Sequence, residues 1–431
     1  MSRKIKYILV IEHGLPFKSF MFDKLRVRGY RIIVATTKFN QDLLKYCDKD
    51  NIILTDTFDK NTLYDDVSFF VSSKNIKLFD ILTFKESSVI ETAFIRGKFN
   101  LKGLTYEVAN RTSQNKYNMR FFLKENGFIN QPNFKKFNIL HVRSVDDLRE
   151  MKYPIVIKPL FGSSSHGVVK ISSVESIQHG IDMATFSMKK EDREKFKLFN
   201  GDMLAEEYIP SGDVLSVDGV VDNIGTIFII GSTQFIMGQE PYFDQVASFI
   251  PPIQEDSVLC KLKILTKEVI NLLGITGTIF HCEWKISGKD ITLLEIAARP
   301  VGGGILQGYE KVYGVNLIDY YLDILEHIPV KNKLNDEDLK VVMHKSIFPD
   351  ITKKSILKKN PNFNFIKDLK YVWDFLNFSK KDQVLLVRPD TPSQLGYYAI
   401  EASSHKKIFE RSRFIDSQIR YKSQLYNENF K

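Results

Sequence analysis

Buried strands and amphipathic helices alternate in the first hundred residues of the chain. Residues 5–11 form a largely apolar run, which is typical of a strand buried in a parallel sheet. A helical pattern follows and ends near Gly29, a residue favoured at helix C-termini. Further strands are predicted over 31–36 and 79–84, and a helix over 88–96. This alternation predicts a doubly wound parallel α/β domain.

A different pattern begins at Pro132, after a helix predicted over 112–127. The strands become short and are separated by turn residues, which predicts antiparallel pairing. They cover residues 155–159, 167–172, 203–209, 214–222, 225–236, 277–287 and 290–299. We expect the first two to form a hairpin with a glycine-rich tip, the next three to form one meander, and the last two to form a second hairpin.

Length and composition are those of a globular protein with several domains. A chain of 431 residues predicts about three domains, and its 43% hydrophobic and 26% charged residues exclude a disordered or collagen-like chain. The net charge is +9, of which +8 lies in residues 331–431. A basic region can bind nucleic acid or an acidic membrane, but no nucleic-acid motif accompanies its lysines. We therefore favour a solvated face and expect no nucleic-acid or membrane partner.

Three cysteines and the N-terminus bear on the compartment. Cys47, Cys260 and Cys282 are far apart and odd in number, which argues against a disulfide framework. The first apolar run stops at Glu12 and is too short for a signal-peptide core. No stretch approaches the ~20 apolar residues of a membrane helix. We expect a cytoplasmic protein.

A glycine- and serine-rich loop follows a lysine in an apolar strand. The loop Gly162-Ser163-Ser164-Ser165-His166-Gly167 offers backbone N–H groups and hydroxyls to an anion. It is not a P-loop, because no Lys-Ser/Thr pair follows, and a flexible hairpin tip explains it equally well. Lys158 is costly to bury without an anionic partner. A surface lysine is the alternative, and we favour a phosphate partner.

Carboxylates mark two further places. Glu206 and Glu207 lie near the end of a strand that stops at Ile209, and a turn follows over residues 210–213 and ends at Asp213. Free backbone groups there can contact a base, and a carboxylate can accept hydrogen bonds from vicinal hydroxyls. Taken alone, a solvated acidic turn is the simpler interpretation.

Glu283 and Glu295 lie on opposite arms of the second predicted hairpin. A turn at 287–290 brings them side by side on one sheet face. Because like charges repel, a cation should hold them, and Mg²⁺ takes one or two carboxylates together with phosphate oxygens. The alternative is an ion pair with Lys285 or Arg299.

Arg299 is followed closely by three glycines, at 302–304. A guanidinium can hold a carboxylate or a phosphoryl group in transfer through two N–H groups. Three consecutive glycines are entropically costly, so we interpret the run as functional.

As an ordered set, these residues resemble the ATP-grasp superfamily over roughly residues 80–328. The set runs from Lys116 through Lys158 with its loop, Glu206, Asp213, His281-x-Glu283 and Glu295 to Arg299. Residues 277–325 are similar to the C-terminal signature of carboxylate–amine ligases of the L-amino acid ligase type.

The resemblance implies an ATP-grasp fold of class α/β. Its parts would be an N-terminal doubly wound parallel α/β domain (1–107), a linker helix with a small α+β lid domain (108–208), and a C-terminal α+β domain with an antiparallel sheet (209–431). The last domain would include a basic subdomain (331–431).

The resemblance also implies roles. Lys116 and Lys158 would hold the phosphates of ATP, covered by the loop 162–167. The adenosine contacts would come from Glu206, the backbone of Glu207 and Ile209, and Asp213 at the ribose. Glu283 and Glu295 would bind Mg²⁺, as two ions, with Mn²⁺ as a substitute. Arg299 would hold the substrate carboxylate and then the acyl phosphate, while residues 240–252 would line the acceptor pocket.

Two positions depart from the common ATP-grasp pattern. Ala297 stands where many of these enzymes carry Asn, as in the amino-acid-ligase branch, and leaves the metal shell one protein ligand short. Asn115 replaces the usual Asp before Lys116.

We therefore expect an ATP-dependent ligase whose carboxylate substrate is an amino acid. It would join this carboxylate to an amine through an acyl phosphate and release ADP and phosphate. Its expected partners are small-molecule carboxylates and amines, with a carrier protein or peptide acceptor and a homodimer as further hypotheses. Two alternatives remain open. One is a carboxylase-like or purine-pathway enzyme using bicarbonate or formate, and the other is a nucleotide-binding, carrier-protein-docking module with little catalysis.

Overall fold

The computed structural model describes most of the chain. The described residues are 5–15, 18–141, 145–162, 165–189, 200–210, 212–238, 240, 243–331, 340–387, 392–419 and 425–426. The predicted site residues Ser163 and Ser164 lie outside them. No described helix is long and apolar enough to cross a lipid bilayer.

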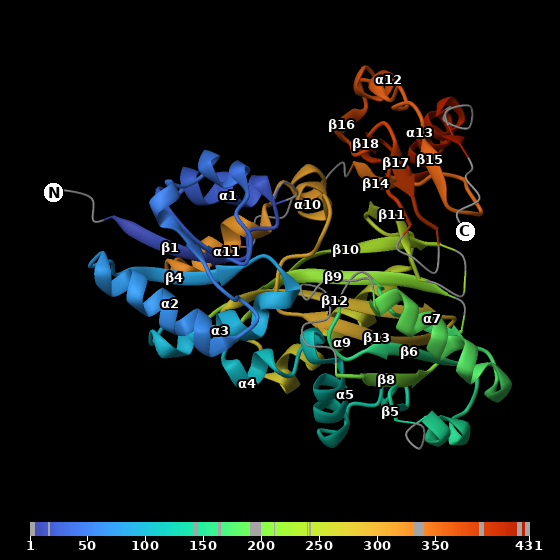
Figure 1. Cartoon of the computed structure of the whole chain (residues 1–431), viewed down its shortest axis with the longest axis horizontal. Coiled ribbons are helices and arrows are strands. Elements are labelled where there is room, and N and C mark those ends of the chain that lie inside the picture. Colours follow the sequence, from blue (N-terminus) through green and yellow to red (C-terminus); the bar gives the residue numbers. More distant parts are fainter. Residues whose placement is uncertain are drawn as a thin grey trace.

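The N-terminal part is a four-stranded parallel sheet with helices packed on it (Figure 1). The strands are β1 (Lys6–Ile11), β2 (Tyr30–Thr36), β3 (Ile52–Leu54) and β4 (Leu78–Thr83), in the order β3-β2-β1-β4. The helices are α1 (Ser19–Val27), α2 (Lys60–Ser73) and α3 (Val89–Lys98). Residues 8–11 are buried on both faces of β1, which confirms the predicted parallel α/β unit.

The linker contains a shorter helix than the sequence predicts. The segment 112–127 divides into a 3-10 turn (Ser113–Asn115) and α5 (Lys116–Glu125), preceded by α4 (Tyr106–Ala109). The Asn115 side chain accepts a hydrogen bond from the backbone N–H of Asn118 and so caps α5. Lys116 is therefore the first residue of the helix.

A small antiparallel sheet forms the lid. Its strands are β5 (Phe134–Asn138), β6 (Ile155–Pro159), β7 (Val169–Ile171) and β8 (Asp202–Glu207), in the order β5-β8-β6-β7, with α7 (Ile177–Lys189) against it. The β6–β7 hairpin confirms the first predicted hairpin. The predicted three-strand meander is wrong for 203–209, because β8 is central in the lid sheet. Residues 203–206 are buried on both faces, so alternation could not assign the strand to a sheet.

An eight-stranded antiparallel sheet forms the rest. Its order is β13-β12-β9-β10-β11-β14-β18-β16. The strands are β9 (Asp213–Val221), β10 (Ile227–Met237), β11 (Gln245–Ile250), β12 (Thr278–Ser287), β13 (Asp290–Ala297), β14 (Val341–Ile347), β16 (Val372–Asn377) and β18 (Gly396–Ala402). The helices are α9 (Asp256–Leu273), α10 (Ile305–Tyr313), α11 (Leu317–Leu325), α12 (Asn364–Lys367) and α13 (His405–Gln418). A three-stranded sheet, β17-β15-β19, uses Gln383–Leu385, Ser355–Leu357 and Leu425–Tyr426.

Short 3-10 helices complete the described structure. They are Gln41–Lys45, Lys49–Asn51, Glu86–Ser88, Ser113–Asn115, Asp147–Glu150 and Val174–Ser176.

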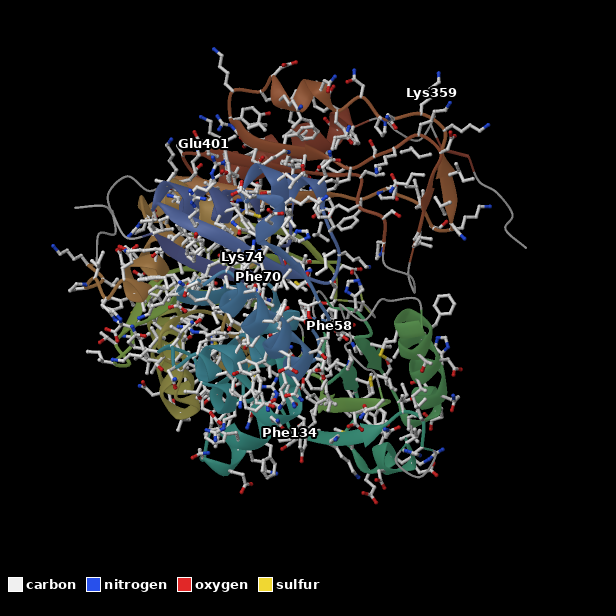
Figure 2. The ribbon with its side chains drawn as sticks, turned by 60° about the vertical axis from the view of Figure 1, so that its left-hand side comes forward. Phe58, Phe70, Lys74, Phe134, Lys359 and Glu401 are labelled. Carbon is white, nitrogen blue, oxygen red and sulfur yellow. The ribbon has the colours of Figure 1, made fainter. Side chains whose placement is uncertain are left out.

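The basic C-terminal region extends the large sheet. β14 pairs with β11, and β18 and β16 follow it. Lys353, Lys354, Lys358 and Lys359 are exposed, and Figure 2 shows Lys359 at the outer edge of this region. These positions agree with a solvated face. The boundaries 1–107, 108–208 and 209–431 stay predictions.

Candidate functional site

One large cavity of about 1570 Å³ is lined by residues from all three parts of the fold. Ten of the predicted site residues line it: Lys116, Lys158, Gly162, Ser165, Glu206, Glu207, Ile209, Glu283, Glu295 and Arg299. Two others that the structure describes, Gly167 and Asp213, are not part of the lining. Much of the segment 243–248, within the predicted acceptor region, lines the cavity as well.

Two carboxylates face each other across a pair of strands. Glu283 on β12 is the direct register partner of Glu295 on β13, so the predicted hairpin and its side-by-side carboxylates are confirmed. Glu283 accepts a hydrogen bond from Nε2 of His281 at 2.8 Å, and the Lys116 ammonium lies 3.7 Å from Glu295. Arg299 forms an ion pair with Glu86 at 2.7 Å instead.

A buried network holds Glu283 through His281. Nδ1 of His281 contacts Asp218 at 2.7 Å, and Asp218 also accepts hydrogen bonds from Tyr309 and Ser216. Burial alone would lower the pKa of His281, but Asp218 and Glu283 raise it to about 10. Burial opposes ionisation of Glu283, yet the contacts with His281 outweigh it and lower the pKa of that carboxyl. Asp218 was not predicted as a site residue, although a single carboxylate in an apolar strand could have marked it as one.

The pair of carboxylates fits a hard divalent cation. Within the part of the chain that the structure describes, no group of three or more His, Cys, Asp or Glu side chains could hold a metal. Two carboxylates suffice for Mg²⁺ when phosphate oxygens and water complete its octahedron. The donor set of Glu283 and Glu295 therefore suits a magnesium–nucleotide complex better than a metal held by protein alone.

Lys158 is buried in an ion-pair cluster of the lid. Its side chain is 10% exposed and lies 2.6 Å from Glu206, whose carboxylate also pairs with Arg120 at 2.7 Å. Arg120 additionally donates to the carbonyl of Leu294. Burial would raise the pKa of Glu206, but Arg120 and Lys158 lower it to about 2, while burial lowers the pKa of Lys158. The alternative of a surface position for Lys158 is therefore excluded. Arg120 was not among the predicted site residues.

The glycine loop is tied to the linker helix. Lys116 donates a hydrogen bond to the carbonyl of Gly162 at 2.9 Å. Gly167 has a φ of +70°, and a Cβ there would lie 3.2 Å from Met188 and 3.3 Å from Pro159. Glycine is thus required at 167 by the backbone and by packing against the lid helix.

Glu206, Glu207 and Ile209 line the cavity, whereas Asp213 lies at the surface. Backbone N–H groups of Glu207 and Tyr208 donate to the carbonyls of Asn133 and Pro154. Asp213, at the start of β9, is exposed, and its carboxylate accepts from Gln254 at 2.6 Å.

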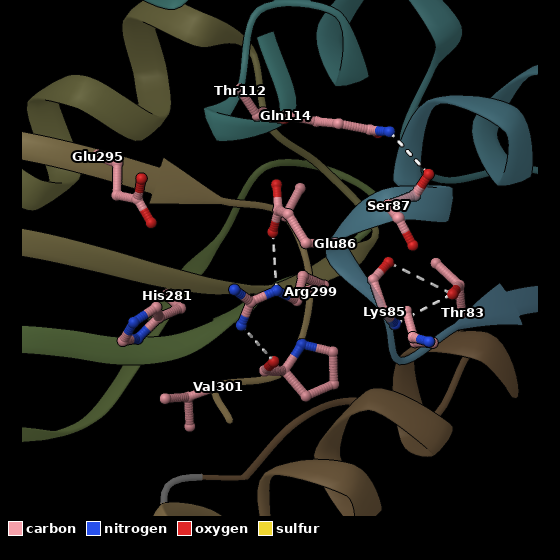
Figure 3. A network of polar contacts seen from close by, with 12 residues as sticks. Thr83, Lys85, Glu86, Ser87, Thr112, Gln114, His281, Glu295, Arg299 and Val301 are labelled. Atoms are coloured by element: carbon pink, nitrogen blue, oxygen red, sulfur yellow. Dashed lines mark hydrogen bonds and ion pairs between the residues drawn. The ribbon is translucent and has the colours of Figure 1, made fainter. Parts of the chain in front are cut away.

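Arg299 links the large sheet to the N-terminal part. Its Nε donates to Glu86 at 2.7 Å and its Nη1 to the carbonyl of Pro300 at 2.8 Å. Figure 3 shows this contact, with Glu295 and His281 on the neighbouring strands. Glu86 lies 213 residues away in sequence and carried no signal that marked it as a partner.

Comparisons with known proteins point to one domain family. Residues 151–307 match the model of the ATP-grasp domain family. The chain is 24% identical over 209 residues to an alanine–anticapsin ligase of Bacillus subtilis (strain 168), covering 46% of this chain and 44% of that protein. It is 28% identical over 175 residues to a formate-dependent phosphoribosylglycinamide formyltransferase of Wolinella succinogenes, covering 38% and 40%. The matches therefore span less than half the length of these relatives.

The fold resembles that of solved structures over nearly the whole chain. An L-amino acid ligase from Bacillus licheniformis superposes with a TM-score of 0.79 at 18% identity, covering 99% of this chain and 100% of that one. At this identity the likeness establishes the shared fold.

Proposed function

We propose that this protein, which carries an ATP-grasp domain and has the ATP-grasp fold, is an ATP-dependent carboxylate–amine ligase. One observation carries the proposal: Glu283 and Glu295 are register partners on the wall of a cavity that Lys116, Lys158 and Arg299 also line. Two acidic groups beside three cationic groups suit the Mg²⁺ complex of ATP together with a carboxylate substrate that accepts the phosphoryl group.

Each lining residue then has a proposed task. Glu283 and Glu295 would hold two Mg²⁺ ions, with Mn²⁺ as a substitute, and when bound these ions neutralise charge on the phosphates. Lys116 and Lys158 would bind the phosphates beneath the loop 162–167. The proposed adenosine contacts are Glu206, Glu207, Ile209 and Asp213, the last from outside the present cavity lining.

The chain's own residues would position the reactants. Arg299, fixed by Glu86, would orient the carboxylate so that its oxygen attacks the γ-phosphorus and ADP leaves. Arg299 would then hold the acyl phosphate while an amine attacks its carbonyl carbon, expelling phosphate and losing a proton. Phosphoryl transfer requires positioning and charge neutralisation rather than a protein nucleophile.

The test is ADP release from Mg-ATP with mixtures of amino acids, read together with product mass. We expect release that depends on both a carboxylate and an amine, and a strong reduction of release by Glu295→Gln. Release of AMP would contradict an acyl-phosphate route.

A second candidate is favoured by the similarity to the formate-dependent formyltransferase. In that case formate or bicarbonate alone would support ADP release, and amino acids would add nothing. A carrier-protein acceptor, a homodimer and a cytoplasmic location stay predictions.

A further inference from the structure

The cavity continues beyond Arg299 to the strands of the C-terminal region. Four of its lining side chains come from different elements there: Gln307 on α10, His344 on β14, Trp373 on β16 and Tyr397 on β18. We call these four residues the aromatic subsite. Gly304, five residues after Arg299, connects it to the proposed reaction centre.

Polar atoms of the aromatic subsite are buried without partners. Within the described residues, no hydrogen bond of good geometry reaches either ring nitrogen of His344, Nε1 of Trp373, Oη of Tyr397 or Oε1 of Gln307. Such atoms cost free energy when they are left unpaired, and proteins rarely leave them so.

A buried tryptophan and a buried tyrosine elsewhere in the fold do have hydrogen-bond partners. Nε1 of the fully buried Trp284 donates to Thr266 at 3.0 Å. The hydroxyl of Tyr398, the residue after Tyr397 on β18, contacts Ser412 at 2.9 Å. Other buried side-chain atoms without a partner occur in the described residues, for example at Ser68 and Ser232, but five of them belong to these four cavity-lining residues. We take this grouping as a sign of a missing binding partner.

The aromatic subsite is closely built. The rings of His344 and Tyr397 are parallel within 7°, and Trp373 stands at 88° to His344 with centroids 5.3 Å apart. A Cβ at Gly304 would collide with the Tyr397 hydroxyl and lie 2.8 Å from Cδ2 of His344, and a Cβ at Gly308 would lie 2.7 Å from its Cε1. Gly304, which precedes α10, and Gly308 within it are therefore needed for the rings to approach.

Most charged side chains around the aromatic subsite have an ion-pair partner. Lys311 lies 3.8 Å from Glu401, Lys345 pairs with Asp416, and Glu310 lies 3.5 Å from Lys24. Burial lowers the pKa of His344 to about 3, only partly opposed by the backbone of Gly304, so its imidazole is neutral at pH 7. Burial also raises the pKa of Asp374, the remaining acidic side chain in this part of the lining.

We propose that the aromatic subsite binds a neutral, planar group that both donates and accepts hydrogen bonds, such as a primary carboxamide or a nitrogen heteroaromatic ring, carried by one substrate. The flat rings would enclose the plane of the group. Trp373 can only donate, Oε1 of Gln307 can only accept, and neutral His344 and Tyr397 can do both. This inference rests on the proposed function, because it assigns a specificity element to the same cavity.

The test compares near-isosteric side chains by direct binding. Calorimetry of the full chain with Mg-ADP would be run with L-glutamine, L-methionine, L-glutamate and L-lysine. We expect glutamine to bind roughly 10-fold or more tightly than methionine, since several neutral hydrogen bonds are gained. Glutamate and lysine should bind no better than methionine.

Tyr397→Phe removes one partner and should reduce the glutamine-to-methionine ratio roughly 3- to 10-fold. Tyr398→Phe is the matched control, because it changes the same strand on the opposite face and should leave the ratio unchanged. Circular dichroism would check that both variants fold.

Binding is measured without turnover, so the two proposals can fail separately. An absence of ADP release would refute the ligase function while the binding ratios still judge the aromatic subsite. Equal binding of glutamine and methionine, no binding of any probe, preference for a charged side chain, or an unchanged ratio in Tyr397→Phe would each overturn the inference.

Discussion

Replacing Glu206 by glutamine should remove an acid-sensitive part of the stability of the lid. Glu206 is 4% exposed, and its carboxylate lies between the cations of Arg120 and Lys158. Its folded pKa of about 2 lies below the usual 4.5 of a free glutamate carboxyl. A depressed carboxyl pKa stabilises the folded state above the unfolded pKa, and this contribution is lost as pH falls through the folded pKa.

The magnitude follows from the same two values. The difference between 4.5 and about 2 corresponds to about 3 kcal/mol at pH 7. More than half of that contribution is lost by about pH 3, where the unfolded carboxyl is already protonated. The total cost of Glu206→Gln at pH 7 should reach about 3–5 kcal/mol, because two buried cations lose their counter-charge.

The assay is urea denaturation of wild type and variant at pH 7, 5, 4 and 3. We expect the difference in unfolding free energy to be largest at pH 7 and to shrink toward pH 3. Glu207→Gln is the matched control, since the Glu207 side chain bonds the amide of Asn133 at the surface, and it should follow wild type at every pH. A Glu206→Gln difference that stays constant from pH 7 to pH 3 would refute the reasoning.

Three further predictions concern the metal and the core. Glu295→Gln should lower ADP release by about 100-fold or more with an unchanged circular dichroism spectrum, given that even outer-shell changes cost 10- to 100-fold; retained activity would remove this residue from the metal site. EDTA should abolish ADP release and added Mg²⁺ should restore it, whereas activity in excess EDTA would exclude the divalent cation. Trp284→Ala should cost about 3–5 kcal/mol in urea unfolding, because Trp284 is fully buried and donates to Thr266; a loss below about 1 kcal/mol would show that this core collapses around the gap.

The sequence predicted those parts of the site that depend only on residues close together in the chain. Glu283 and Glu295 belong to one hairpin, so the turn between them determines their register. The parallel N-terminal sheet followed from strand–helix alternation in the same way. Lys158 could be predicted because burying a lysine in an apolar strand costs free energy. This argument requires no knowledge of distant residues.

The parts that were missed depend on distant segments. Arg120 meets Glu206 across 86 residues, and Arg299 meets Glu86 across 213. No local pattern states which charged side chain will lie opposite another once sheets have packed. The misplacement of β8 has the same origin, because a strand buried on both faces does not reveal which sheet contains it.

Charge was a poor guide to the C-terminal region, and strand alternation explains why. On β14, Val341, Met343 and Ile347 pack into the apolar core of this region, as do Tyr398 and Ile400 on β18. The intervening positions face the other way, and the register pairs His344 with Ala399 and Ser346 with Tyr397 on that opposite face. His344, Ser346 and Tyr397 line the cavity, whereas the exposed Lys353, Lys354, Lys358 and Lys359 lie outside the eight-stranded sheet. The role of this region therefore follows from the strand face that carries His344, Ser346 and Tyr397. This face supplies a wall of the cavity, and in our proposal the unpaired polar atoms of the wall, not the net charge of the region, select what it binds.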